Sequence, residues 1–136
     1  MLTKLINVAI AVNDIEEAVQ RFGLVFGWKL EGKVTEQPGL GIRTAMLNAG
    51  GSTIELLAPL PGEGPLRRFL DTRGEGLYRL AFAADDLDAT LAHFDANGVA
   101  YVNRSEAAGR ATGNRIVFTH PKSAHGLMVE LVEGAG

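Results

Sequence analysis

Two pairs of polar residues occupy matching places in a sequence that contains nearly the same segment twice. Residues 9–22, AIAVNDIEEAVQRF, recur with changes as residues 81–94, AFAADDLDATLAHF, at a shift of 72 residues. Asn7 and Arg79 each stand two residues before a copy, and the ends of the two halves, TIELLAP and MVELVEG, contain Glu55 and Glu130. Carboxylates transfer protons or bind cations, whereas a guanidinium binds the oxygens of a carboxylate or an enolate. Because a duplicated unit lets equivalent groups converge across a pseudo-twofold axis, we expect these four residues to line one cavity.

The residues around these positions predict the same order of elements in each half. The expected strands of the first half are 5–12, 28–33, 42–47 and 52–57, with a helix over 14–26 that Asp14 can cap and a tight hairpin at Gly50-Gly51. The expected strands of the second half are 78–84, 99–103, 114–119 and 127–132, with a helix over 86–96. The order β-α-β-β-β, found twice, predicts an α+β fold within a single domain over residues 1–136. Module one covers about 4–58, a crossover with a helical centre covers 59–76, and module two covers about 77–133.

Composition excludes several classes of function. The chain of 136 residues has a net charge of −3 and no basic stripe, which argues against binding to nucleic acid or to a membrane surface. No apolar run approaches the length of a membrane span, and the N-terminus reads as a strand rather than as a signal peptide. The absence of cysteine excludes disulfides, thiolate catalysis and cysteine-ligated metals. We expect a cytoplasmic protein with a small-molecule ligand.

Phrases spread over nearly the full chain carry a resemblance to a known superfamily. They are NVAIAVNDIEEAV, the FGW at 26–28, IELLAPL at 54–60, RGEGLYRLAFAADDLDA at 73–89 and NRIVFTHPKSAHGLMVEL at 114–131. In this order they resemble the vicinal-oxygen-chelate superfamily of glyoxalases, bleomycin-resistance proteins and extradiol dioxygenases, and most of all its methylmalonyl-CoA epimerases. The resemblance implies a glyoxalase-like fold, in which two βαβββ modules form a curved mixed sheet around one cavity.

The resemblance also implies a metal site, from which this sequence departs. In the superfamily a divalent metal acts as a Lewis acid, held by a residue of the first strand of each module, typically His, and by Glu or Gln of the last strand. Glu55 and Glu130 match, but Asn7 and Arg79 replace the two histidines. Asparagine is a weak neutral ligand, and arginine offers donors alone and cannot bind a cation. We therefore expect no cofactor, with Arg79 offsetting the two carboxylates; if a metal is bound, its ligands are Glu55, Glu130 and Asn7.

Two classes of function remain open. The first is an isomerase, epimerase or lyase that acts next to a carbonyl, with Glu130 or Glu55 as the catalytic proton-transfer group and Arg79 and Asn7 among the substrate-binding residues. Thr44 is also a candidate for substrate binding, because it falls near the place of a proposed acid/base glutamate of the epimerases, whose work a threonine cannot do. The alternative is a protein of the bleomycin-resistance type, which sequesters a ligand without chemistry. A metal-dependent methylmalonyl-CoA epimerase is a third possibility.

Two further expectations concern a loop and a surface. The segment KSAHG resembles an epimerase loop near the mouth of the cavity, which makes Lys122 and His125 candidates for contact with a ligand. Leu24, Val25 and Phe26 extend beyond a single apolar helix stripe, which suggests an additional buried contact. Since members of the superfamily commonly pair, we expect a homodimer.

Overall fold

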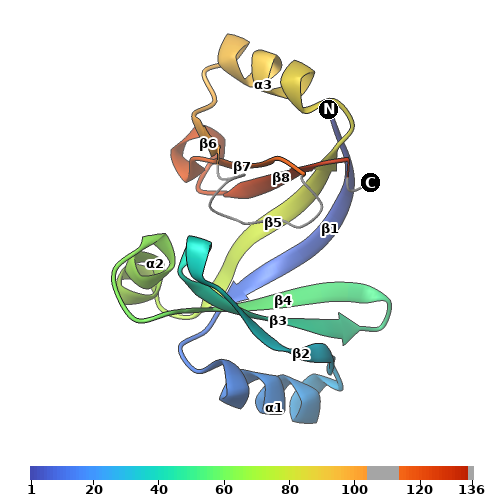
Figure 1. The fold of residues 1–136 in the computed structure, drawn as a ribbon, viewed down its shortest axis with the longest axis vertical. Helices are drawn as coiled ribbons and strands as arrows, with labels where there is room; N and C mark the ends of the chain where they lie inside the picture. The colour runs from blue at the N-terminus through green and yellow to red at the C-terminus, as the bar shows by residue number, and fades with distance from the viewer. Residues whose placement is uncertain (104–113, 135–136) are drawn as a thin grey trace. The chain divides into compact units, whose positions relative to one another are not determined.

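The computed structural model describes residues 1–103 and 114–134, which fall into two compact units. The N-terminal unit consists of residues 7–78, and the C-terminal unit consists of residues 1–6 together with the chain from residue 79 onward. The elements follow the predicted order, βαβββ twice with a helix between, so the α+β fold class is confirmed (Figure 1). In chain order they are β1 (Leu2–Ala11), α1 (Ile15–Phe26), β2 (Lys29–Gln37), β3 (Ile42–Ala49), β4 (Ser52–Pro59), α2 (Pro65–Arg73), β5 (Gly76–Ala84), α3 (Leu87–Ala96), β6 (Tyr101–Asn103), β7 (Ile116–Thr119) and β8 (Val129–Glu133).

The sheet of the N-terminal unit has the strand order β2-β3-β4-β1, with β1 parallel to β4 and the other pairs antiparallel. Helix α1 packs on one face of this sheet, where Ile15 is fully buried among side chains that include Leu47 and Leu56. Helix α2 buries Leu66 and Leu70 in a second cluster that contains Ala9, Ala11 and Leu57. Since successive side chains of a strand point to opposite faces, Leu56 and Leu57 assign the two helices to opposite faces of the sheet.

The C-terminal unit repeats this arrangement with one helix. The first residues of β1 lie beside β5, where the Thr3 hydroxyl donates to the Ala83 carbonyl oxygen at 3.4 Å, and β8, β7 and β6 follow in order. Strand β5 is parallel to β8, and β7 is antiparallel to both of its neighbours. Helix α3 packs Leu87 into a cluster with Val117 and Leu131. One sheet face of each unit is therefore closed by a helix that follows the first strand of its module.

The helices begin and end where the sequence predicts. The side chains of Asp14 and Asp86 each accept a hydrogen bond at 3.0 Å from the backbone three residues later, which satisfies a free N–H group of the first turn. Helix α1 ends at Gly27, whose φ of 73° is left-handed and suits a residue without a Cβ. The predicted Gly50-Gly51 hairpin is confirmed, with positive φ at both glycines.

Strand boundaries differ from the predictions at the edges. Strand β2 runs to Gln37, well beyond the predicted end at Lys33, because its register against β3 shifts between Glu31 and Thr35 and the strand resumes after the irregularity. Strands β7 and β8 begin two residues later than predicted, at Ile116 and Val129.

An ion pair at equivalent positions ties the first turn of the helix to the sheet in each unit. Arg43, next to Thr44 on β3, donates from Nη1 to Glu16 at 3.0 Å, and Arg115 donates from Nη1 to Asp88 at 2.8 Å. Arg115 follows Arg43 by 72 residues, and Asp88 follows Glu16 by the same interval. The duplication therefore includes this ion pair between helix and sheet as well as the repeated sequence segment.

Candidate functional site

Glu55 lies in the middle of the N-terminal sheet, on the face opposite α1. Its Cα pairs with Ala9 of β1 and Met46 of β3, and its neighbour Leu56 belongs to the cluster that α1 covers. Alternation therefore directs the Glu55 side chain to the other face, as the sequence predicts. The residue is 5% exposed, and its Oε2 accepts a hydrogen bond of 3.0 Å from the Thr44 hydroxyl. Asn7 precedes Ala9 by two residues on β1, so it shares this face and is buried as well.

Glu130 occupies the corresponding place in the C-terminal unit. Its Cα pairs with Ala81 of β5 and Phe118 of β7, and its neighbours Val129 and Leu131 belong to the cluster under α3. Arg79 stands two residues before Ala81, so it shares the face of Glu130. The Arg79 Nε lies 3.7 Å from Glu130 Oε2, and both side chains are 5% exposed. The structure thus brings together Arg79 and Glu130 in one unit, and Thr44 and Glu55 in the other.

The two units place these residues at equivalent strand positions, but the partner of the glutamate is of a different type in each unit. In each, a glutamate of the last strand lies beside an alanine of the first strand, and the second candidate stands two residues before that alanine. Thr44 pairs with Leu57 two residues beyond Glu55, and Ile116 pairs with Val132 two residues beyond Glu130. Glu55 consequently has a hydroxyl partner from the middle strand, where the other unit has an isoleucine. Glu130 has a guanidinium partner from the first strand, where the other unit has Asn7.

The donor set does not fit a divalent metal. A dication held by Glu130 would be repelled by the guanidinium of Arg79 at 3.7 Å, and arginine has no lone pair to offer it. Over residues 1–103 and 114–134 no group of three or more His, Asp and Glu side chains is arranged to hold a metal ion. Within the C-terminal unit, the buried Glu130 carboxylate therefore lies beside a permanent organic cation. The placement of all four residues around one cavity stays a prediction.

The two loop candidates lie on the surface of the C-terminal unit. Lys122 is exposed in the 3-10 turn Pro121–Ala124, where its backbone N–H donates to Nδ1 of His120 at 3.1 Å. His125 ends this turn in the left-handed region, with φ of 55°, and is also exposed. This conformation is uncommon for a residue other than glycine, and it fixes the direction of the chain into β8. Contact of either side chain with a ligand stays a prediction.

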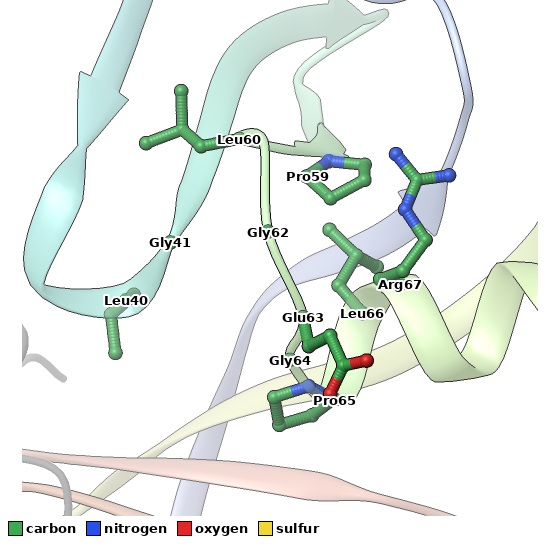
Figure 2. Close-up of a pocket in the computed structure, with 10 residues that line it drawn as sticks. All are labelled: Leu40, Gly41, Pro59, Leu60, Gly62, Glu63, Gly64, Pro65, Leu66 and Arg67. Carbon is green, nitrogen blue, oxygen red and sulfur yellow. The ribbon is translucent and has the colours of Figure 1, made fainter.

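A pocket in the N-terminal unit lies at the start of α2 (Figure 2). Its lining is mostly glycine, proline and leucine, with two charged residues; it comprises Leu40, Gly41, Pro59, Leu60, Gly62, Glu63, Gly64, Pro65, Leu66 and Arg67. The four candidate site residues are absent from this lining. Glu63, the carboxylate of this pocket, is exposed.

Comparison with known proteins identifies the superfamily of this chain. Residues 7–118 match the model of the glyoxalase/bleomycin resistance protein/dioxygenase superfamily. The chain belongs to this superfamily. It is similar to the methylmalonyl-CoA epimerase of Dictyostelium discoideum, with 31% identity over 131 residues, 96% of this chain and 78% of the relative.

Solved structures of the glyoxalase superfamily show the same likeness over the whole length. The methylmalonyl-CoA epimerase of Mycobacterium tuberculosis has 36% identity and a TM-score of 0.82, covering 99% of this chain and 90% of its own. A variant of the Streptomyces coelicolor epimerase, in complex with 2-nitronate-propionyl-CoA, has 30% identity and a TM-score of 0.82 over the full length of both chains. The predicted resemblance to this superfamily and to its methylmalonyl-CoA epimerases is confirmed.

Sequence reasoning missed the pairing of Thr44 with Glu55. It considered Thr44 as a substitute for a glutamate and as a contact for substrate, whereas the structure shows its hydroxyl donating to another candidate residue. The hairpin at Gly50-Gly51 sets the register of β3 against β4, so counting back from that turn would have placed Thr44 diagonally across from Glu55.

Proposed function

We propose that this glyoxalase-superfamily protein binds an acyl-CoA-type molecule with a carbonyl and a carboxylate, and moves a proton on the carbon next to the carbonyl without a divalent metal. The similarity to methylmalonyl-CoA epimerases over the whole chain supports the class of ligand. One solved epimerase complex contains 2-nitronate-propionyl-CoA, and another contains methylmalonyl-CoA and NH4+. The reaction class is therefore an isomerisation, with epimerisation as its simplest form.

The observation that carries the metal-free part is the buried pair of Arg79 and Glu130. A fixed guanidinium supplies positive charge beside the buried Glu130 carboxylate, and it does so without a labile ligand. It also donates hydrogen bonds in a planar fork, which suits a carboxylate or an enolate oxygen of a substrate. The charge that a metal supplies elsewhere in the superfamily is here part of the chain.

The proposed step is a proton transfer. A glutamate, Glu55 or Glu130, accepts the proton from the carbon next to the thioester carbonyl, and the C–H electron pair moves into an enolate whose oxygen carries the charge. Arg79 stabilises that charge, because a donor fixed in place before the reaction requires little reorganisation as the charge develops. If the glutamate returns the proton to the same face, the starting compound is formed again. If water protonates the opposite face of the carbon, the epimer is formed, and the glutamate then loses its proton to solvent.

Deuterium incorporation from solvent tests this proposal. Methylmalonyl-CoA is incubated with the protein in D2O containing EDTA, and mass spectrometry follows a gain of one mass unit at the exchangeable carbon. We expect exchange above the rate without protein, and a loss of that excess in the Arg79→Met variant. Arg68→Gln changes an exposed arginine of α2 and serves as the matched control. Activity abolished by EDTA and recovered on addition of Co²⁺ would instead identify a metal-dependent epimerase.

A ligand-sequestering protein of the bleomycin-resistance type is the second candidate. The observation that favours it is the replacement of both first-strand histidines by Asn7 and Arg79, which removes Lewis-acid chemistry without providing a new base. Calorimetric titration with methylmalonyl-CoA separates the two proposals. Binding with a 1:1 stoichiometry, together with deuterium incorporation no faster than in buffer, would support sequestration over catalysis.

A further inference from the structure

We infer that the half-buried apolar side chain beside each buried glutamate, Met46 beside Glu55 and Phe118 beside Glu130, determines which alkyl group the reacting carbon of the substrate can carry. The inference rests on the proposed function and deepens it, because it names the part of the acyl group that these side chains recognise. It comes from the registers of the two sheets, each taken within its own unit.

Met46 is the direct neighbour of Glu55 on β3. The two Cα atoms are paired across the antiparallel register of β3 and β4, so both side chains lie on the sheet face opposite α1. Side chains paired in this way have Cβ atoms about 5 Å apart. Met46 therefore provides apolar surface within reach of a ligand group that contacts the Glu55 carboxylate.

This methionine keeps an exposure to solvent that the other paired neighbour of Glu55 lacks. Ala9, paired with Glu55 on β1, is fully buried in the cluster that α2 covers. Met46 is half-buried, and among residues 1–103 and 114–134 it packs in none of the three clusters of buried hydrophobic residues. A large apolar side chain that joins no core and borders a buried carboxylate is available for contact with an apolar group of a ligand.

The C-terminal unit repeats this arrangement at the interval of 72 residues. Phe118 follows Met46 by that interval and is paired with Glu130, whose other paired neighbour, Ala81, is 1% exposed. Phe118 is also half-buried, and within the described part of the chain it lies outside the cluster that α3 covers. The duplication therefore kept the apolar type and the partial exposure of this neighbour, while the size and shape of its side chain changed.

The proposed substrate has one apolar group at its reacting carbon. Besides the hydrogen that is lost, this carbon of methylmalonyl-CoA bears a thioester carbonyl, a carboxylate and a methyl group. The two oxygen-bearing groups need hydrogen-bond donors when they leave water, whereas the alkyl group gains from apolar contact. A glutamate that takes the proton must lie next to this carbon, so the apolar neighbour of that glutamate is placed to contact the alkyl group.

Truncation of these neighbours is tested with ethylmalonyl-CoA, whose alkyl group is one methylene longer than that of methylmalonyl-CoA. Met46→Ala and Phe118→Ala make room beside the two glutamates, and the milder Met46→Val and Phe118→Leu replace them if truncation unfolds the protein. Truncation beside the glutamate that acts should raise the ratio of the two deuterium-exchange rates, ethylmalonyl-CoA over methylmalonyl-CoA, roughly four- to tenfold, because one buried methylene changes binding by about that factor. The variant that changes the ratio also identifies the glutamate beside the reacting carbon.

Two control variants remove apolar volume from the opposite sheet faces. Ile54 is half-buried against the cluster under α1, and Phe82 is half-buried against the cluster under α3. Ile54→Ala and Phe82→Leu should lower the free energy of unfolding in urea and leave the ratio unchanged. Calorimetric titration of all variants with the two thioesters gives the ratio of their dissociation constants, which reports recognition of the alkyl group without turnover.

The outcomes separate this inference from the proposed function. Ratios that stay unchanged, in exchange and in binding, in both Met46→Ala and Phe118→Ala overturn the inference and leave the proposed function standing. An equal change in the two control variants also overturns it, because the effect is then a general loosening of the fold. A changed ratio of dissociation constants in a protein that exchanges no proton supports the recognition of the alkyl group and refutes the proton transfer. A parent protein that binds neither thioester refutes both.

Discussion

The replacement Arg79→Met should destabilise the protein strongly at neutral pH. Arg79 and Glu130 form an ion pair at 3.7 Å with both side chains 5% exposed, so the variant leaves a buried carboxylate without its cation. At an effective dielectric constant of about 20, two unit charges at this separation interact with about 4 kcal/mol. Removing one partner of a buried pair costs about 3–5 kcal/mol in measured cases, which agrees. A domain of this size has about 5–15 kcal/mol of stability in total, so the loss should be evident.

Urea unfolding followed by circular dichroism measures the effect. We expect the free energy of unfolding to fall by about 3–5 kcal/mol in Arg79→Met at pH 7. In the double variant Arg79→Met/Glu130→Leu most of the stability should return, since neither charge of this pair is then left buried without the other. The exposed Arg68→Gln should stay within about 0.5 kcal/mol of the parent protein.

Two results would refute this reasoning. A loss below about 1 kcal/mol in Arg79→Met would show that the Glu130 carboxylate is solvated or balanced elsewhere, and that the guanidinium is not what allows its burial. A double variant no more stable than the single one would show that the cost comes from lost packing of the arginine stem rather than from the unbalanced charge.

Three further predictions concern the metal, acid stability and association. Protein purified without added metal should contain no stoichiometric divalent ion by elemental analysis, and Asn7→His together with Arg79→His should bind one equivalent, because this restores the ligand set of the superfamily. A hydrogen bond from Arg115 lowers the pKa of Glu133. Their interaction therefore stabilises the fold at pH values above the usual glutamate pKa, and this stabilisation is lost as the pH falls through the lowered pKa. Arg115→Met should be less stable than the parent protein near pH 7, and the difference in the free energy of unfolding should vanish in acid. Sedimentation at micromolar concentration should show a homodimer, which Leu24→Glu should weaken if the exposed end of α1, where Leu24 is 81% exposed, forms the contact; a monomeric parent protein would contradict the prediction.

Local signals in the sequence were enough to predict the elements and the faces of the candidate residues. The helix starts at Asp14 and Asp86 depend on hydrogen bonds to the backbone only three residues later. The hairpin depends on two adjacent glycines with positive φ. Alternation along IELLA and VELVE placed Glu55 and Glu130 on the faces opposite α1 and α3, because the period of a strand requires no knowledge of its neighbours. The interval of 72 residues revealed the duplication, and it also relates Arg43 to Arg115, a pair that sequence reasoning overlooked.

The partners of those residues were decided by tertiary structure. Thr44 meets Glu55 because an antiparallel pairing brings together residues 11 apart, and a slip of one residue in that pairing would turn the hydroxyl to the face that α1 covers. Arg79 meets Glu130 because a parallel pairing aligns Ala81 with Glu130 across more than half of the C-terminal unit's chain. Burial decides how strongly the pair interacts. The same arginine and glutamate on an exposed face would form a weak, solvated pair, whereas at 5% exposure each one offsets the buried charge of the other.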